Sequence, residues 1–302
     1  MSSAMESSNV RGAIYESLLK LKLIHPDTLT VFAERTRDVD DLKVFADTAS
    51  GVIFIDDYYV GDDEYRSGKF RDLPKPGMDT PGRDLEDFLD TSRRMATFGR
   101  YLPNQSICDL GCGAGSFLKE ARNFAKSVVG VELQERYREQ LIAQGIPCVS
   151  DIGAVGHGLD CIFLFHSFEH FKDPLETLQQ VHGHLKPDGG RVVIEVPHAR
   201  DFLLTTMALP KFKQFTLWSQ HLILHTRNSL EAFMRAAGFK NVVVSGVQRY
   251  SISNHIQWMK DGKPGGHKSN LAMLDNNEMT NAYSDTLSRL DANDTLVAVA
   301  TT

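Results

Sequence analysis

SICDLGCGAG, residues 106–115, is the stretch that decides the fold. An apolar run ends at the acidic Asp109, and three glycines, Gly111, Gly113 and Gly115, then alternate with other residues before a helical pattern begins. Glycine lets the backbone turn tightly and approach a ligand closely, and the first turn of the following helix offers free N–H groups. The stretch therefore predicts a strand, a ligand-binding turn and a helix in direct succession.

Strand and helix signals alternate on the C-terminal side of this turn. Continuous apolar runs such as LDCIFLF and RVVIEV are typical of strands buried on both faces of a parallel sheet. We therefore predict an α/β fold with a doubly wound, seven-stranded, Rossmann-like sheet. Its strands are expected at 106–110, 128–133, 147–152, 159–165, 191–196, 241–247 and 295–301, and its main helices at 116–126, 135–144 and 173–186.

The chain divides near Pro81-Gly82. In residues 1–82 the pattern predicts an N-terminal helix at 9–24, then short extended segments, then a loop at 56–82. We expect this whole segment to fold over the mouth of the active site. Residues 83–302 form the sheet domain, with lid insertions at about 200–228 and 248–293. Insertions of this length in a compact domain are usually functional or disordered.

Composition narrows the class of protein. The chain has 302 residues, 42% of them hydrophobic and 24% charged, with a formal net charge of −6. A protein with a net negative charge does not attract the negatively charged phosphate backbone of a nucleic acid. We therefore expect a small-molecule partner and no nucleic acid. The four cysteines form no CxxC pair, and neither a signal peptide nor an 18-residue apolar run is found, so we expect a cytoplasmic protein without a membrane span.

An acidic residue follows each of the first two strands. Asp109 lies two positions before the first glycine, and Glu132 lies seventeen residues after Gly115. The motif DLGCGAG resembles the first motif of the class I methyltransferases that depend on S-adenosylmethionine (SAM). That resemblance implies SAM as cofactor, with Glu132 on the ribose hydroxyls and Asp151 with Ile152 beside the adenine. The implied cofactor-binding residues are Asp109, Gly111, Cys112, Gly113, Gly115, Glu132, Leu133, Asp151, Ile152 and His166.

A second group, His166, Glu169 and His170, follows the fourth strand, where open α/β sheets place their ligands. In one interpretation a histidine or Glu169 is the general base that removes the proton from the acceptor, worth roughly 10²–10⁴ in rate. In the other, Glu169, His170 and His221 hold a divalent metal, as in the small-RNA and ubiquinone-pathway O-methyltransferases that the segment resembles. Because His166 stands where those families have Glu, the sequence favours the base. Glu169 and His170 are also compatible with simple helix capping.

A third group lies in the insertion after 248. Arg, Asn, His and Trp side chains suit a polyhydroxylated ligand, whose ring an aromatic face can cover. This stretch resembles a bacterial subgroup of class I methyltransferases associated with sugar and polysaccharide modification. An ordered lid or an oligomer contact is the alternative. The predicted substrate-binding residues are Tyr65, Arg249, Tyr250, Asn254, His255 and Trp258.

The resemblance thus implies O-methylation of a sugar or sugar-derived metabolite by in-line displacement at the sulfonium methyl. Such an enzyme mainly has to align acceptor, methyl and sulfur and exclude water. N-methylation of an amino sugar and C-methylation of a keto-sugar are alternatives. A catalytically silent SAM-binding subunit and a NAD-dependent oxidoreductase are the others.

Overall fold

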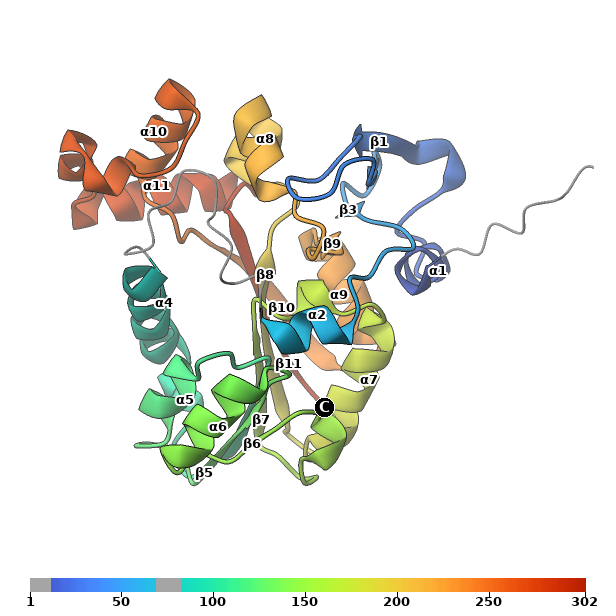
Figure 1. Cartoon of the computed structure of the whole chain (residues 1–302), viewed down its shortest axis with the longest axis vertical. Coiled ribbons are helices and arrows are strands. Elements are labelled where there is room, and N and C mark those ends of the chain that lie inside the picture. The colour runs from blue at the N-terminus through green and yellow to red at the C-terminus, as the bar shows by residue number, and fades with distance from the viewer. Residues whose placement is uncertain (1–11, 69–82) are drawn as a thin grey trace, which may run out of the picture.

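The computed structural model describes residues 12–68 and 83–302 (Figure 1). Its centre is a seven-stranded sheet in the order β10-β11-β8-β7-β4-β5-β6. All neighbours pair in parallel except at β11, which runs antiparallel to both β8 and β10. The strands are β4 (Ser106–Leu110), β5 (Ser127–Val131), β6 (Cys148–Val149), β7 (Cys161–Phe165), β8 (Arg191–Pro197), β10 (Lys240–Val247) and β11 (Thr295–Thr301). The predicted doubly wound seven-stranded sheet is confirmed.

Helices cover both faces of this sheet. Phe117 and Leu141, from two helices of one face, join Phe163 of β7 in one apolar cluster. Leu178 and Phe233, from helices of the other face, join the opposite side chains of the same strands in a second cluster. The first face carries α4 (Arg83–Phe98), α5 (Ser116–Ala121) and α6 (Glu135–Ala143), and the second carries α7 (Pro174–His184) and α9 (Arg227–Ala236). The sheet is therefore buried on both sides, as its continuous apolar strands require.

Local sequence explains where these helices begin. The Asp173 side chain accepts a hydrogen bond from the backbone N–H of Glu176, and Pro174 occupies the first turn of α7. In α9 the Thr226 and Ser229 side chains form a reciprocal capping box. Both arrangements satisfy N–H groups that a helix start leaves without partners.

A second, four-stranded antiparallel sheet lies at the end of the molecule that also holds the inserted helices (Figure 1). Its order is β1-β2-β3-β9, so the N-terminal strands pair with a strand from the first insertion. The strands are β1 (Leu29–Ala33), β2 (Val44–Asp47), β3 (Ile53–Phe54) and β9 (Ile223–Leu224). Helix α1 (Ala13–Lys20) precedes this sheet, α8 (Pro210–Thr216) belongs to the first insertion, and α10 (Ile252–Asp261) and α11 (Asn277–Arg289) form the second.

One part of the expected loop at 56–82 is wrong, because α2 (Asp62–Ser67) forms within it. Acidic residues occupy its first turn, Arg66 pairs with Asp62 and Asp63, and Gly68 ends it in a left-handed conformation. These features all favour a helix. The helix has only six residues, however, which is too short to show the repeating pattern of apolar residues by which a helix is predicted from sequence. Residues 69–82 of the expected loop and 9–11 of the expected N-terminal helix lie outside the described residues.

No helix in 12–68 or 83–302 combines the length and the apolar character needed to cross a bilayer.

Candidate functional site

The glycine turn joins β4 to α5 and is held against the end of β5. The backbone N–H groups of Gly111 and Cys112 both donate to the carbonyl of Val131, at 2.8 and 3.1 Å. Gly111, Gly113 and Gly115 have φ of +83°, +56° and +71°. Such angles are strained for any residue with a Cβ, so the turn needs its glycines.

Two of these glycines also lack room for a side chain. A Cβ on Gly111 would lie 2.5 Å from the Cβ of Ser167, and a Cβ on Gly115 would lie 2.4 Å from a methyl of Leu141. Ser167 follows β7, and its hydroxyl donates to the Leu110 carbonyl at 2.7 Å. The turn is therefore packed tightly between the ends of β4 and β7.

Glu132, at the end of β5, ties the turn to the next strand. Its two carboxylate oxygens accept hydrogen bonds from the backbone N–H of Gly113 at 2.8 Å and of Gln134 at 2.9 Å. A carboxylate has about four acceptor positions, so both oxygens keep capacity for ribose hydroxyls. Glu132 also lines the cavity described below.

Asp109 is buried at the end of β4, and its Oδ1 has no hydrogen-bond partner among the described residues. Burial raises the pKa of this carboxyl to about 7, the cation of Arg94 acts to lower it, and Glu132 acts to raise it. An orphaned carboxylate oxygen of this kind fits a positively charged ligand, because a cation would compensate its desolvation. This carboxyl and the glycine turn thus fit SAM, which carries a positively charged ammonium and sulfonium.

A cavity of about 310 Å³ opens beside the turn. Of the residues predicted to bind cofactor, Gly111, Glu132, Leu133, Asp151, Ile152 and His166 line it. Asp109, Cys112, Gly113 and Gly115 do not line it; they shape the turn behind the cavity wall. Their direct contact with a cofactor stays a prediction.

The cavity continues past the end of β7, where His166 and His170 also line it. His166 has φ of +50°, a rare left-handed conformation for this residue type, and its backbone N–H donates to the Glu195 carbonyl at 2.8 Å. This conformation points the imidazole between two carboxylates: Nδ1 lies 3.4 Å from Glu169 and Nε2 lies 3.3 Å from Glu195. Strain of this kind is typical of functional sites.

The two carboxylates favour the protonated form of His166. Burial and the nearby Arg249 act to lower the pKa of His166, but Glu169 and Glu195 outweigh them and raise it. Burial alone would raise the pKa of Glu169, yet the neighbouring His166, His170 and His221 hold it at about 2. A protonated histidine has no lone pair to accept a proton, so His166 is a poor general base.

Glu195 was not among the predicted site residues. It lies in the middle of β8, fully buried, and accepts hydrogen bonds from Arg93 at 2.9 Å and from Arg94 at 2.6 Å. Both arginines come from α4, so this carboxylate links α4 to the strand ends. The signal was available in the sequence, because a lone acidic residue inside the apolar run RVVIEV needs a buried partner.

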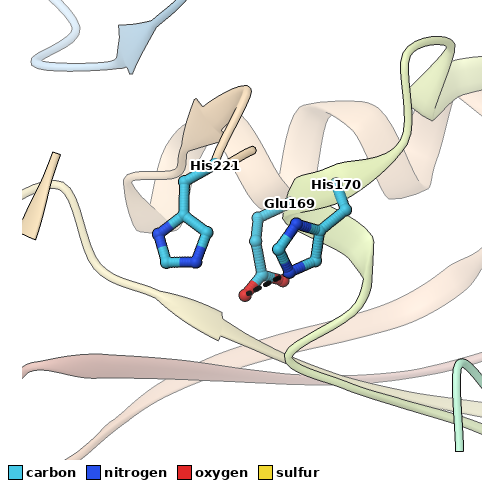
Figure 2. A group of neighbouring side chains, drawn as sticks. All are labelled: Glu169, His170 and His221. Atoms are coloured by element: carbon cyan, nitrogen blue, oxygen red, sulfur yellow. Dashed lines mark ion pairs between the residues drawn. The ribbon is translucent and has the colours of Figure 1, made fainter. Parts of the chain in front are cut away.

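Glu169, His170 and His221 converge from two different segments (Figure 2). One ligand atom from each lies within 4.8 Å of the others. Glu169 and His170 follow β7, whereas His221 precedes β9 of the small sheet. Figure 2 shows the two imidazoles flanking the Glu169 carboxylate, with His170 Nε2 4.0 Å from it.

The surroundings of this cluster suit a metal. His170 Nδ1 lies 2.7 Å from the Gln220 carbonyl, which fixes Nδ1 as the donor and leaves a lone pair on Nε2. Among the described residues, neither oxygen of the buried Glu169 carboxylate accepts a hydrogen bond of regular geometry, although Nδ1 of His166 lies 3.4 Å from one of them. Burial first, and then the charge of His170, lower the pKa of His221 well below its usual value, so its ring is neutral. A carboxylate and two imidazoles form a donor set for a divalent ion.

The tyrosines after β3 contribute to the cavity. Tyr59 and Tyr65 line it, with ring centroids 5.7 Å apart and stacked. Tyr65 belongs to α2, and its hydroxyl lies 3.5 Å from His170 Nδ1. The N-terminal segment thus supplies one wall of the cavity, beside the cluster.

The other predicted substrate-binding residues lie outside the cavity lining. Arg249 forms an ion pair with Asp90 of α4, and the backbone N–H of Tyr250 donates to Asp294 at 2.9 Å. The remaining three residues make these contacts: Asn254 accepts from the backbone of Gly265, His255 Nδ1 lies 2.7 Å from the Tyr283 hydroxyl, and Trp258 packs on Phe212 and Phe215. Their described contacts are therefore with the protein itself.

Comparisons with known proteins agree with this geometry. A family model described as a methyltransferase domain matches residues 82–244, more than half of the chain. The tRNA U34 carboxymethyltransferase of Pseudoalteromonas atlantica is 26% identical over 176 residues, which cover 52% of this chain and 52% of the relative. The chain thus spans about half the length of that curated relative.

Two solved structures share the fold. A SAM dependent methyltransferase from Archaeoglobus fulgidus superimposes with a TM-score of 0.51 at 17% identity, over 72% of this chain and 94% of its own. A methyltransferase in complex with the Trm112 methyltransferase activator of Haloferax volcanii gives a TM-score of 0.51 at 16% identity, over 80% and 96%. This chain belongs to the methyltransferase domain family, and its fold is that of the SAM-dependent methyltransferases.

Proposed function

We propose that this SAM-dependent methyltransferase transfers a methyl group to a hydroxyl of a small, sugar-like acceptor, and that Glu169, His170 and His221 bind a divalent cation beside it. One observation carries the proposal: the cofactor-side residues Gly111 and Glu132 line the same cavity as His170. A cofactor on the glycine turn would therefore direct its methyl group toward the histidine cluster.

The cavity walls suit a polar acceptor. Asp62, Lys172 and Asp173 supply charged groups, while the stacked Tyr59 and Tyr65 supply aromatic surface. This mixture of aromatic faces and hydrogen-bonding groups is the usual way to hold a sugar ring in a defined orientation. Orientation is most of what the reaction needs, because SAM already carries an activated leaving group.

A metal is the better role for the cluster than a general base. A bound divalent cation supplies Lewis-acid chemistry that lowers the pKa of an acceptor hydroxyl. Without one, two carboxylates favour the protonated form of His166, and burial lowers the pKa of His221 well below its usual value, so neither is a strong base. The protein's own part is to hold His170 in one tautomer through Gln220.

The net charge of the chain bears on the class of acceptor. The curated relative is named for a tRNA nucleoside, whereas the net charge of −6 here favours a small molecule over an RNA backbone. Transfer of label from methyl-labelled SAM should therefore be measured on free sugars, amino sugars, nucleotide sugars and bulk tRNA. Labelling of tRNA alone would contradict the proposed acceptor class.

Chelation separates the roles of the cluster. EDTA should stop turnover, and Mg²⁺, Mn²⁺ or Zn²⁺ should restore it. His170→Ala and His221→Ala should both be inactive, whereas His267→Ala, which removes an exposed histidine of the second insertion, should be unaffected. Full activity in EDTA, with a rate that rises with pH through an ionisation lost in one histidine variant, would assign a general base instead.

A further inference from the structure

A second, larger cavity of about 680 Å³ lies between the two insertions and the N-terminal sheet. It is bordered by the segment after β1, by α8, and by the C-terminal end of α10 with the residues that follow it. These are the elements gathered at the upper end of the molecule in Figure 1. None of the cofactor-side residues of the first cavity lines it.

Cations dominate the lining of this second cavity. Arg35, Arg37, Lys211 and Lys263 face it, against the single carboxylate of Asp261. Asp261 already accepts a hydrogen bond from Gln257 on its own helix. The chain as a whole has a net charge of −6, so four cationic side chains around one cavity make this region locally positive in a negatively charged protein.

Three of these cations lack an acidic partner. Arg35 pairs with Asp40 at 2.6 Å, but no carboxylate in 12–68 or 83–302 forms an ion pair with Arg37, Lys211 or Lys263. The carboxylate next to Arg37 in sequence, that of Asp38, accepts hydrogen bonds from the backbone and hydroxyl of Ser219. The cavity therefore holds positive charge that no ion pair among the described residues neutralises.

Arg37 is also held rigidly. Its Nη1 donates to the Phe215 carbonyl at 3.2 Å, and its guanidinium lies 4.6 Å from the centroid of the Trp218 ring. Burial lowers the pKa of Arg37, and the charge of Asp38 only partly opposes this. An anion in the cavity would offset that desolvation, because it would give the half-buried guanidinium an opposite charge.

We infer that this cavity binds the phosphate or diphosphate group of a small molecule. The fixed fork of Arg37 can donate two parallel hydrogen bonds to phosphate oxygens, and the flexible lysines can approach the remaining oxygens as point charges. Phe215 and the largely buried Trp258 supply an apolar wall for a ring attached to the phosphate. The inference goes beyond the proposed methyl transfer and does not depend on which acceptor is methylated.

Calorimetric titration of the whole chain tests the site, with inorganic phosphate, inorganic pyrophosphate and a nucleoside diphosphate as probes. Pyrophosphate should bind at one site and more tightly than phosphate, and added salt should weaken it. A nucleoside diphosphate that binds more tightly than pyrophosphate identifies a phosphate ester as the ligand, and equal affinity identifies the free anion. The uncharged nucleoside should not bind.

Variants locate the binding. Lys211→Ala and Lys263→Ala should each weaken pyrophosphate by roughly tenfold, the loss expected for one charge-assisted hydrogen bond. Both lysines are exposed, so the midpoint of thermal unfolding should not change. Lys260→Ala is the matched control, because this exposed lysine belongs to α10 but does not line the cavity.

Three results would overturn the inference. The first is the absence of saturable pyrophosphate binding at low salt. The second is an equal loss in Lys260→Ala and Lys211→Ala, which would indicate general surface charge. The third is binding of a single-stranded oligonucleotide that pyrophosphate does not displace, which would make the cavity part of a nucleic-acid surface.

Discussion

Gly111→Ala tests the packing of the cofactor turn, and Gly158→Ala is its matched control. The two glycines have almost the same φ, +83° and +80°, so a Cβ is strained by this angle to a similar degree at both. They differ in surroundings: a Cβ on Gly111 would lie 2.5 Å from the Cβ of Ser167, whereas a Cβ on Gly158 would meet nothing within 4 Å. Any difference between the variants therefore measures the contact and not the conformation.

The magnitudes follow from these two terms. A left-handed conformation costs an L-residue about 1–2 kcal/mol, so Gly158→Ala should lower the free energy of unfolding by that amount. Gly111→Ala should lose the same amount and about 1–3 kcal/mol more, the usual cost of forcing a methyl group into filled space. Its SAM affinity should also fall, because the turn must move to relieve the contact.

Urea unfolding of both variants, followed by circular dichroism, gives the two free energies, and calorimetry gives the SAM affinities. Adding Ser167→Gly to Gly111→Ala removes the opposing Cβ and should recover part of the loss in a double-mutant cycle. Equal destabilisation of Gly111→Ala and Gly158→Ala, with SAM binding intact in both, would refute the argument that the turn is sterically closed against Ser167.

Three further results are expected. Glu132→Ala should weaken SAM and its demethylated product equally, by about 1.5–3 kcal/mol in calorimetry, because both ligands keep the ribose; an unchanged affinity would move the ribose contact elsewhere. Glu195→Gln should lower the pKa of His166 in an NMR titration, since one of its two carboxylates becomes neutral; a constant value would leave Glu169 alone responsible. Burial lowers the pKa of His198 to about 4 and that of His225 to about 3. Because the unfolded chain takes up these protons below about pH 6.5, the free energy of unfolding should fall from there toward pH 4, and a flat profile from chemical denaturation would contradict the buried neutral state.

Much of the fold could be predicted from the sequence, because the residues of each central strand themselves indicate that the strand is buried. The side chains of β7 are all buried, and so are those of β4 beyond its first residue. A continuous apolar run between turn signals is enough to reveal such a strand. The helix start at Asp173-Pro174 was equally local, since capping depends on residues within one turn.

The small sheet could not be predicted in the same way. Strands β3 and β9 have two residues each, and Ile53 pairs with Leu224 across most of the chain. Nothing within either segment specifies a partner that distant. The structure gives Arg249 and Trp258 neighbours within the protein that only the tertiary fold creates, and their contact with a ligand stays a prediction.

The sequence predicted those residues of the candidate site that lie close together along the chain. The structure brings Glu169 and His170 together with His221, a grouping that the family resemblance had suggested. The sequence indicates that Glu195 needs a buried partner, but it does not identify the partners, because Arg93 and Arg94 come from a helix about a hundred residues earlier. Charge partners across a sheet depend on register and not on spacing.

The pairing of β3 with β9 has a consequence for how the protein folds. Loop closure over such a distance is entropically unfavourable until the intervening sheet has already brought the two ends near each other. The small sheet should therefore join late, and His221, two residues before β9, should reach Glu169 only in the last step of folding. Amide hydrogen exchange at Ile223 and Leu224 should then be faster than at the central strands, so the central sheet can persist while the histidine cluster is transiently taken apart.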